Sequence, residues 1–249
     1  MKFLRTLAVS TASIALAFGI EARPVNRLRQ TRGEKVVTAD DFLKGRVERG
    51  SGKELTLRVS IRTGLPPYTI RIVPNPAATS VSGNTPQNAG RIEISKDGSN
   101  TIDQTIDVES FGDGAMLVNY FTMEDINFDG YLDIGTLYEF GAKWGAYNFL
   151  VFDPPSGRFI SNDFTRQLEG IKANKRKLDP EHKTIHFSFL TAGEGRIGET
   201  YEVANGTLIL TLFEDRRKSK DGGFEIVTSR IHNGEMTVLG VRKEQQSNQ

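Results

Sequence analysis

The feature of this sequence that most constrains its fold is the alternation of apolar and polar residues in short runs over most of the chain. Between residues 54 and 62, Leu55, Leu57, Val59 and Ile61 alternate with polar neighbours. A period of two is the repeat of a half-buried β-strand. Similar runs recur at YTIRIV, RIEIS, TIDQTIDVES, YNFLVFD, RFISN, KTIHFSFL, ETYEVA, GTLILTLFE, GFEIVTSRI and EMTVLGV. The chain is therefore predicted to be rich in strands.

Short turn signals separate several of these runs. Asp97-Gly98, Asn205-Gly206 and Asn233-Gly234 are pairs that favour tight β-hairpins. MLVNYFTMEDI is predicted to start a further strand, and only residues 163–176 are predicted to form a helix, a short one. We therefore expect an all-β, antiparallel fold, either a β-sandwich or a propeller-like sheet.

The N-terminus carries a pattern typical of export. Two basic residues precede an apolar stretch from Thr6 to Ile20 that is short for a membrane span. Residues 1–22 are accordingly interpreted as a secretory signal peptide, and a retained signal anchor is the alternative. We expect a loosely ordered segment over residues 23–52, a single β domain over 53–243 and a polar tail over 244–249. The N-terminus therefore predicts a protein that is exported from the cytoplasm.

Composition limits how such a domain is stabilised and what it binds. The chain contains no cysteine, so disulfides are excluded and a large core, a metal ion or both must stabilise it. Removal of residues 1–22 leaves 30 basic and 30 acidic residues, a balance that selects neither nucleic acid nor membrane. The basic runs Arg23–Lys35 and Lys172–Lys177 are interpreted as a solvated tail and a loop.

The most specific motif is EDINFDGYLDI, which resembles a calcium-binding loop. Positions 1, 3, 5, 7 and 9 are Asp125, Asn127, Asp129, Tyr131 (through its main-chain carbonyl) and Asp133. Gly130 stands at position 6, where such a loop turns sharply. Calcium binds six to eight oxygen ligands, and a set made only of oxygens argues against zinc. Position 12 is Thr136 instead of the glutamate of an EF-hand, so a shorter loop between strands is predicted.

Two alternatives accompany this prediction. The motif can be an acidic hairpin turn that binds no metal, although carboxylates crowded without a cation repel one another. If the ion binds, its role is more often structural than catalytic, because no catalytic constellation is evident beside it. We expect chelation to lower the melting temperature.

Catalytic motifs are weak throughout the sequence. His182 and His186 lack the intervening glutamate of a metalloprotease, and GEGRIG matches a nucleotide-binding pattern by letters alone. Glycoside hydrolysis needs two carboxyl groups at a defined separation. Glu124, Asp125 and Asp153 are candidates by residue type, but their spacing in the sequence does not establish that separation. The prediction is a protein that is not an enzyme, with a glycan hydrolase as a minor alternative.

Exposed aromatic residues are candidates for contact with a partner. Trp144 and Tyr147 lie in GAKWGAY, between glycines and in an expected loop. Tyr131, on the predicted calcium loop, is a third candidate.

Read in order, EDINFDGYLDI, GAKWGAYNFLVFDPPSGRFISN, LDPEHKTI and YEVANGTL resemble the periplasmic immunity proteins of bacterial-killing type IV secretion systems, which are related to periplasmic lysozyme inhibitors. The resemblance covers about residues 115–212. It implies a calcium-bound antiparallel β domain that inhibits a secreted lysozyme-like peptidoglycan hydrolase by inserting a loop residue into its cleft. By the same resemblance, the five loop residues are calcium ligands, and Tyr131, Tyr147 and then Trp144 are the partner-binding candidates.

The predicted function is therefore that of a periplasmic, calcium-binding immunity protein. The alternative is a calcium-stabilised β module that binds glycan or an envelope partner and inhibits nothing, with the same aromatics as a sugar platform.

Overall fold

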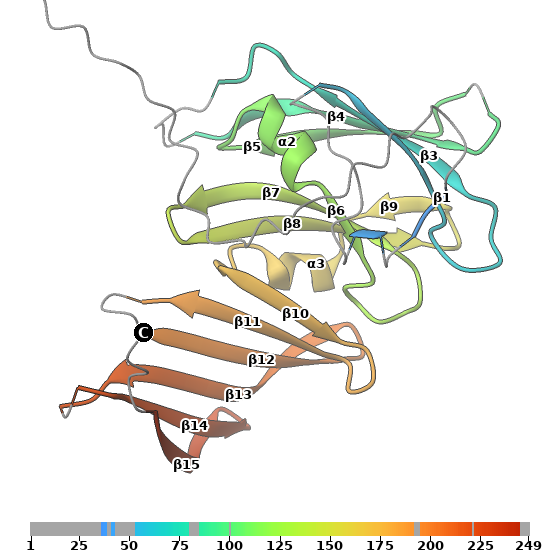
Figure 1. Cartoon of the computed structure of the whole chain (residues 1–249). Helices are drawn as coiled ribbons and strands as arrows, with labels where there is room; N and C mark the ends of the chain where they lie inside the picture. Colours follow the sequence, from blue (N-terminus) through green and yellow to red (C-terminus); the bar gives the residue numbers. More distant parts are fainter. Residues whose placement is uncertain are drawn as a thin grey trace, which may run out of the picture.

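The computed structural model describes residues 36–38, 41–42, 53–79, 85–99, 101–191, 195–220 and 222–244. These described residues form three β-sheets (Figure 1). In spatial order, the first sheet contains β1 (Val36–Val37), β2 (Leu55–Val59), β3 (Tyr68–Pro74), β4 (Gln87–Lys96) and β5 (Gln104–Ser110). The middle sheet contains β6 (Thr122–Glu124), β7 (Asp133–Gly141), β8 (Trp144–Asp153) and β9 (Arg158–Ile160). The last sheet contains β10 (Lys175–Asp179), β11 (Thr184–Leu190), β12 (Arg196–Ala204), β13 (Thr207–Lys218), β14 (Phe224–His232) and β15 (Glu235–Glu244).

The strand pairing confirms the prediction of an antiparallel, all-β fold. Among the described strands, neighbours are antiparallel except for the short parallel pair β1 and β2. In β2, Leu55, Leu57 and Val59 are buried and alternate with polar residues, as predicted. Asn205 and Gly206 both have positive φ, 51° and 72°, which the tight hairpin between β12 and β13 requires.

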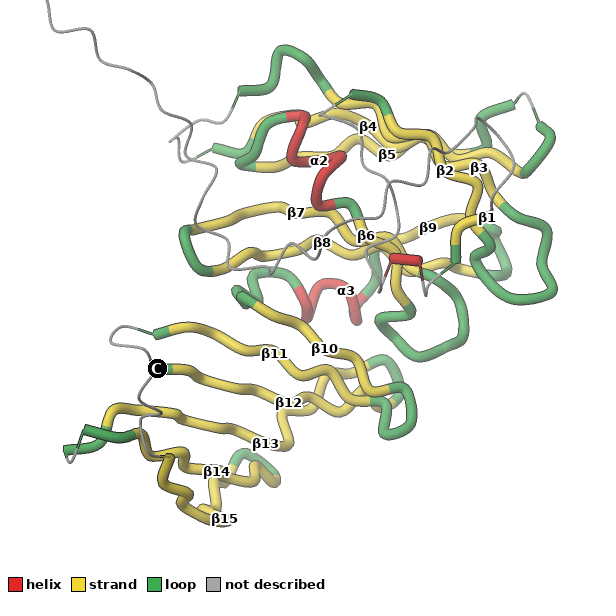
Figure 2. The backbone as a smooth tube through the Cα atoms, in the orientation of Figure 1, coloured by secondary structure: helices red, strands yellow, loops and turns green. Residues whose placement is uncertain are grey.

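The middle sheet is buried on both faces. Along β8, Phe149 and Val151 pack in a core with residues of α3 (Asp163–Leu168), β11 and β12, whereas Phe152 packs in a second core with residues of the first sheet. Successive side chains of a strand point to opposite faces, so one strand contributes to both cores. The result is three stacked layers, with α3 between the middle and last sheets (Figure 2).

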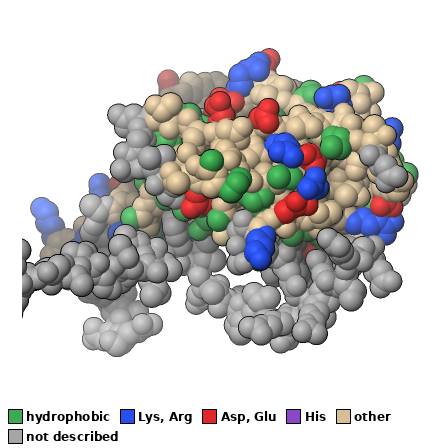
Figure 3. Space-filling model, turned by 90° about the horizontal axis from the view of Figure 1, so that it is seen from above, with side chains coloured by type: hydrophobic (Ala, Val, Ile, Leu, Met, Phe, Trp, Pro, Cys, Tyr) green, Lys and Arg blue, Asp and Glu red, His purple; other side chains and the backbone are tan. Residues whose placement is uncertain are grey.

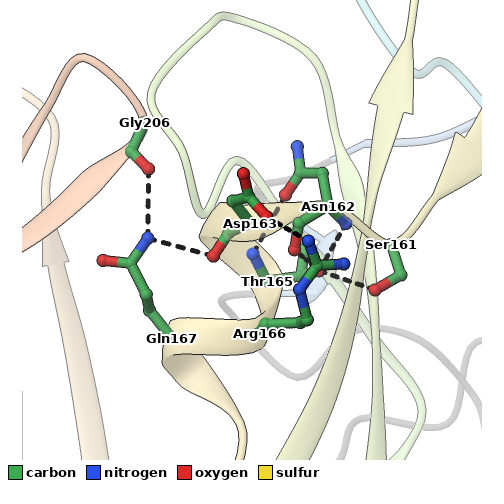
Figure 4. Close-up of polar contacts among 7 residues, drawn as sticks. All are labelled: Ser161, Asn162, Asp163, Thr165, Arg166, Gln167 and Gly206. Carbon is green, nitrogen blue, oxygen red and sulfur yellow. Dashed lines mark hydrogen bonds and ion pairs between the residues drawn. The ribbon is translucent and has the colours of Figure 1, made fainter.

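Helix α3 connects these two sheets through polar contacts. Asn162 and Thr165 form a capping box at its start. The Asn162 side chain accepts from the N–H of Thr165 at 3.0 Å, and the Thr165 hydroxyl accepts from the N–H of Asn162 at 2.9 Å. The Gln167 amide donates to the carbonyl of Gly206 at 3.2 Å (Figure 4). Its oxygen accepts from the N–H of Leu208 at 2.9 Å. The helix therefore holds the β12–β13 turn against the middle layer.

The outward side of the first sheet is a mixed-charge surface. Figure 3, seen from above, shows Lys and Arg interspersed with Asp and Glu. On the outer face of β3 and β4, Arg71 and Arg91 both pair with Glu93, at 2.8 and 2.7 Å. Such interspersed charges are typical of a solvated surface.

Three local predictions were wrong. Residues 116–120, predicted to start a strand, instead lie in helix α2 (Gly114–Tyr120). The Asp113 side chain caps this helix by accepting from the N–H of Met116 at 2.9 Å. The basic run 172–177, expected to be a loop, enters β10 at Lys175, which pairs with β11. Trp144 and Tyr147 lie in β8 and not in a loop, since the turn after β7 is confined to residues 142–143.

Residues 163–176 were correctly predicted to contain a short helix, which is α3. The predicted signal peptide and the terminal tail beyond Glu244 lie outside the described residues, as does most of segment 23–52. None of the helices in the described part of the chain is long and apolar enough to cross a membrane.

Candidate metal centre

The predicted calcium loop connects β6 to β7 in the middle sheet, and Asp129 and Gly130 at its tip are exposed. The two strands remain paired up to Glu124 and Asp133, which are Cα partners. Between them, Phe128 and Gly130 have positive φ, 59° and 88°. Glycine adopts this conformation without strain, so Gly130 allows the sharp turn that the motif predicts. The end of the loop is held by the N–H of Leu132, which donates to the carbonyl of Ile61 at 2.9 Å.

Asp133 is the most buried acidic residue of the loop, with no measurable exposure. Its two carboxylate oxygens accept from the N–H groups of Ile126, at 3.1 Å, and Phe152, at 2.8 Å. Burial raises the pKa of Asp133 to about 8; the charges of Asp129 and Asp125 act in the same direction, and the two N–H donors oppose it. The Asp133 carboxylate thus joins the start of the loop to β8.

The other loop side chains point back toward the loop backbone. Asp125 accepts from the N–H groups of Asp129 and Gly130 at 3.0 and 2.9 Å. Asn127 accepts from the N–H of Asp129 at 3.1 Å and donates to the carboxylate of that residue at 2.9 Å. Burial, followed by the charge of Asp129, raises the pKa of Asp125. Three carboxylates are therefore close enough to influence one another.

The chemistry of this donor set is compatible with calcium. The side chains offer carboxylate and amide oxygens, without nitrogen or sulfur ligands, and hard cations prefer such oxygens. As the side chains lie, however, no group of three or more His, Cys, Asp or Glu residues in the described part of the chain is arranged to enclose a metal ion. Binding of calcium by Asp125, Asn127, Asp129, Tyr131 and Asp133 thus stays a prediction.

The three candidate partner-binding aromatics occupy different environments. The Tyr131 ring stacks on Phe152, with centroids 5.4 Å apart, and the guanidinium of Arg62 lies 4.6 Å from its centre. Trp144 begins β8 next to the β7–β8 turn, and the ammonium of Lys172 lies 4.2 Å from its ring. All three rings are partly buried.

Tyr147 lies farther along β8, at the contact between the middle and last sheets. It lines a cavity of about 170 Å³ together with Phe149, Leu168 and Phe187. Arg176 lies over its ring, 5.0 Å from the centroid. The structure therefore separates the three candidates and does not bring them into one patch.

The weaker catalytic candidates are also separate. The carboxylate of Glu124 is bound by Arg176, and that of Asp153 accepts from the N–H of Ser156 at 3.1 Å. His182 lies 3.0 Å from Asp179 in a turn, while His186 on β11 contacts the hydroxyl of Thr200 at 3.1 Å. The sequence interpretation did not single out Arg176 as a functional residue. Its only signal in the sequence was the basic run that precedes LDPEHKTI.

Comparison with known proteins gives one relevant similarity, in fold. No protein-family model and no curated protein sequence matches the chain. A solved structure described as a Xanthomonas type IV secretion system related protein matches it with a TM-score of 0.52 and 14% sequence identity. The match covers 78% of this chain and 96% of that one. At this identity the similarity shows a shared fold, and a fold alone does not establish function.

Proposed function

We propose that this protein is an exported, non-enzymatic immunity protein of a bacterial-killing type IV secretion system. In this proposal it acts in the periplasm, where it inhibits a secreted lysozyme-like peptidoglycan hydrolase. The observation that carries the proposal is the fold shared with the type IV secretion system related protein, over 96% of that chain. The order of sequence motifs described above supports it independently.

Calcium has a structural role in this proposal. The ligands would be Asp125, Asn127, Asp129, the carbonyl of Tyr131 and Asp133. Support comes from the oxygen donor set and from Asp133, whose buried carboxylate already joins the loop to the N–H of Phe152. A bound cation neutralises these carboxylates and stiffens the loop, which takes over part of the role that disulfides have in other exported proteins.

Inhibition requires a rigid side chain that enters the cleft of the hydrolase. Aromatic residues held by neighbouring packing lose little entropy on binding. The candidates are Trp144 next to the β7–β8 turn, Tyr131 at the end of the metal loop and Tyr147 within β8. Trp144 directly follows an exposed turn formed by Ala142 and Lys143, and Tyr131 directly follows the exposed Gly130.

The test is reconstitution with purified lysozyme-like hydrolases. The chain from residue 23 onward, in calcium, should form a 1:1 complex with its target in size-exclusion chromatography and abolish the release of peptidoglycan fragments at equimolar concentration. The protein alone should release no fragments. Sedimentation of the protein with peptidoglycan in the absence of enzyme, without inhibition of any hydrolase, would instead favour the glycan-binding alternative.

A further inference from the structure

The last sheet carries an open groove on the face that points away from the middle sheet. Along β11, Ile185 and Phe187 pack in the core toward the middle layer, so His186 and Ser188 lie on the opposite face. The groove on that face has a volume of about 620 Å³, and all six strands from β10 to β15 contribute to its lining.

Small residues form the floor of this groove. Ser188 on β11 and Gly198 on β12 are direct cross-strand partners, and Gly198 is followed across the sheet by Glu214 on β13. A Cβ atom on Gly198 would lie 2.9 Å from the His186 ring and 3.2 Å from the Glu214 carboxylate. The hollow thus depends on a glycine at this position.

Basic side chains predominate around the floor. The basic side chains on this face are Lys175, Lys177, Arg196, Arg216 and Arg242, against the carboxylates of Glu214 and Glu244. Arg176 also borders the groove, but its guanidinium binds Glu124 on the opposite face of the sheet. Arg216 and Arg242 share Glu244, at 3.1 and 3.3 Å. Within the described ranges, the ion pairs include no partner for Lys175, Lys177 or Arg196. The groove therefore concentrates positive charge in a chain whose formal net charge is only +1.

Two of these arginines face each other directly. Arg196 on β12 and Arg216 on β13 are cross-strand partners, and the same row continues through Ile226 to Arg242. Like charges directly opposite each other destabilise a sheet. Glu244 pairs with Arg216 and Arg242 but not with Arg196, so a bound anion next to Arg196 would relieve the repulsion that remains.

We propose that this groove binds an acidic, extended peptide segment of a partner protein. Guanidinium groups pair with carboxylates through two parallel hydrogen bonds, which suits an acidic side chain. No Trp, Tyr or Phe is among the described lining residues, so the stacking that sugars and nucleic-acid bases use is missing. The five strand spacings from β10 to β15 total about 24 Å, which is roughly the length of seven extended residues.

This site does not rest on the proposed calcium loop or on inhibition of a hydrolase. Its residues belong to the last sheet, whereas the loop joins β6 and β7. An experiment that rejects the calcium loop or hydrolase inhibition would therefore leave the groove proposal standing, and the reverse also holds.

The test is fluorescence anisotropy of a labelled hexaglutamate peptide titrated with the chain from residue 23 onward at low salt. Saturable binding is expected, with a loss of affinity on moving from about 50 to about 300 mM salt. The double variant Lys177→Ala/Arg196→Ala should weaken binding about tenfold or more, because two charge-assisted contacts are removed. Lys53→Ala/Lys143→Ala, at exposed lysines outside the groove, is the matched control and should change affinity less than about twofold.

Folding of the variants is checked by thermal melting without peptide. Since Lys175, Lys177 and Arg196 are exposed, substitution by alanine should leave the melting temperature unchanged or, for Arg196→Ala, slightly higher. Lys175→Ala provides a second variant that leaves the arginine row intact. Equal affinity of groove and control variants would overturn the proposal, as would absence of saturable binding or tighter binding of inorganic polyphosphate than of hexaglutamate.

Discussion

The guanidinium of Arg176 on β10 binds the carboxylate of Glu124 on β6, with its Nε 3.3 Å from Oε2. The same guanidinium lies over the rings of Tyr147 and Phe149 on β8, at 5.0 and 4.8 Å from their centroids. The side chains of Arg176 and Glu124 are only 15% and 10% exposed. One side chain therefore connects the last sheet to the residue that immediately precedes the metal loop.

We expect Arg176→Ala to lower the free energy of unfolding by about 3 kcal/mol, because it leaves the Glu124 carboxylate buried without its cation. Chemical denaturation measures this loss. The matched control is Arg166→Ala on α3, whose pair with Asp163 is largely exposed and should cost less than about 0.5 kcal/mol. Equal losses for the two variants would show that the Glu124–Arg176 pair is not a specific connection between the sheets.

Calcium at about 100 times its dissociation constant should raise the free energy of unfolding by about 2.7 kcal/mol, because the ion binds only the folded loop. Thermal melting with calcium and with chelator measures the difference. Asp129→Ala should remove most of the response, since it deletes a carboxylate ligand. Asp107→Ala, at an exposed acid on β5, should retain it. Identical melting curves for the unmodified protein under both conditions would contradict the calcium prediction.

The strands were predictable because their signal is local. Alternation in β2 and the Asn205-Gly206 turn depend on neighbouring residues, and the structure has both as expected. Helix α2 was missed because its start depends on the Asp113 cap, and the burial of Leu117 and Val118 fits either a helix or a strand.

Parts of the candidate sites depend on contacts between distant residues, which spacing does not reveal. The metal loop was located from its acidic positions, but the bond from Asp133 to the N–H of Phe152 joins residues 19 positions apart. Arg176 and Glu124 are separated by 52 positions. The basic run 172–177 was interpreted as a loop because Lys175 and Lys177 do not alternate with apolar residues. Main-chain pairing with β11 instead places these two lysines at the edge of a sheet, where they border the basic groove.

The dependence of stability on acid pH should show how much the ion pairs of the first sheet stabilise the protein. The Arg91 guanidinium, followed by that of Arg71, holds the pKa of Glu93 below its usual value, while burial opposes this shift. A lowered pKa in the folded state stabilises the protein above the unfolded pKa of about 4.3, and this stabilisation is lost as pH falls through the folded value.

Glu93→Gln should therefore destabilise the protein at pH 7, and the difference from the unmodified protein should shrink as pH falls below about 4.3. Urea denaturation at a series of pH values measures it. Glu109→Gln, at an exposed position on β5, is the control and should show little difference at any pH. A Glu93→Gln effect that stays constant from neutral to acid pH would contradict the assignment to charge pairing.

The candidate inhibitory aromatics can be distinguished by measuring stability and binding separately. The Tyr131 ring packs between Phe152 and Arg62, so Tyr131→Ala should cost about 2 kcal/mol of stability in chemical denaturation, whatever it does to binding.

Trp144, at the start of β8 beside an exposed turn, should behave differently. Trp144→Ala should weaken the complex with the target hydrolase by about 2 kcal/mol, as is typical of an aromatic anchor, and calorimetric titration measures this change. Trp144→Phe keeps an aromatic ring and should retain more of the affinity. If Tyr131→Ala, Tyr147→Ala and Trp144→Ala all fold and all bind the hydrolase as the unmodified protein does, then none of these aromatics is the inserted residue.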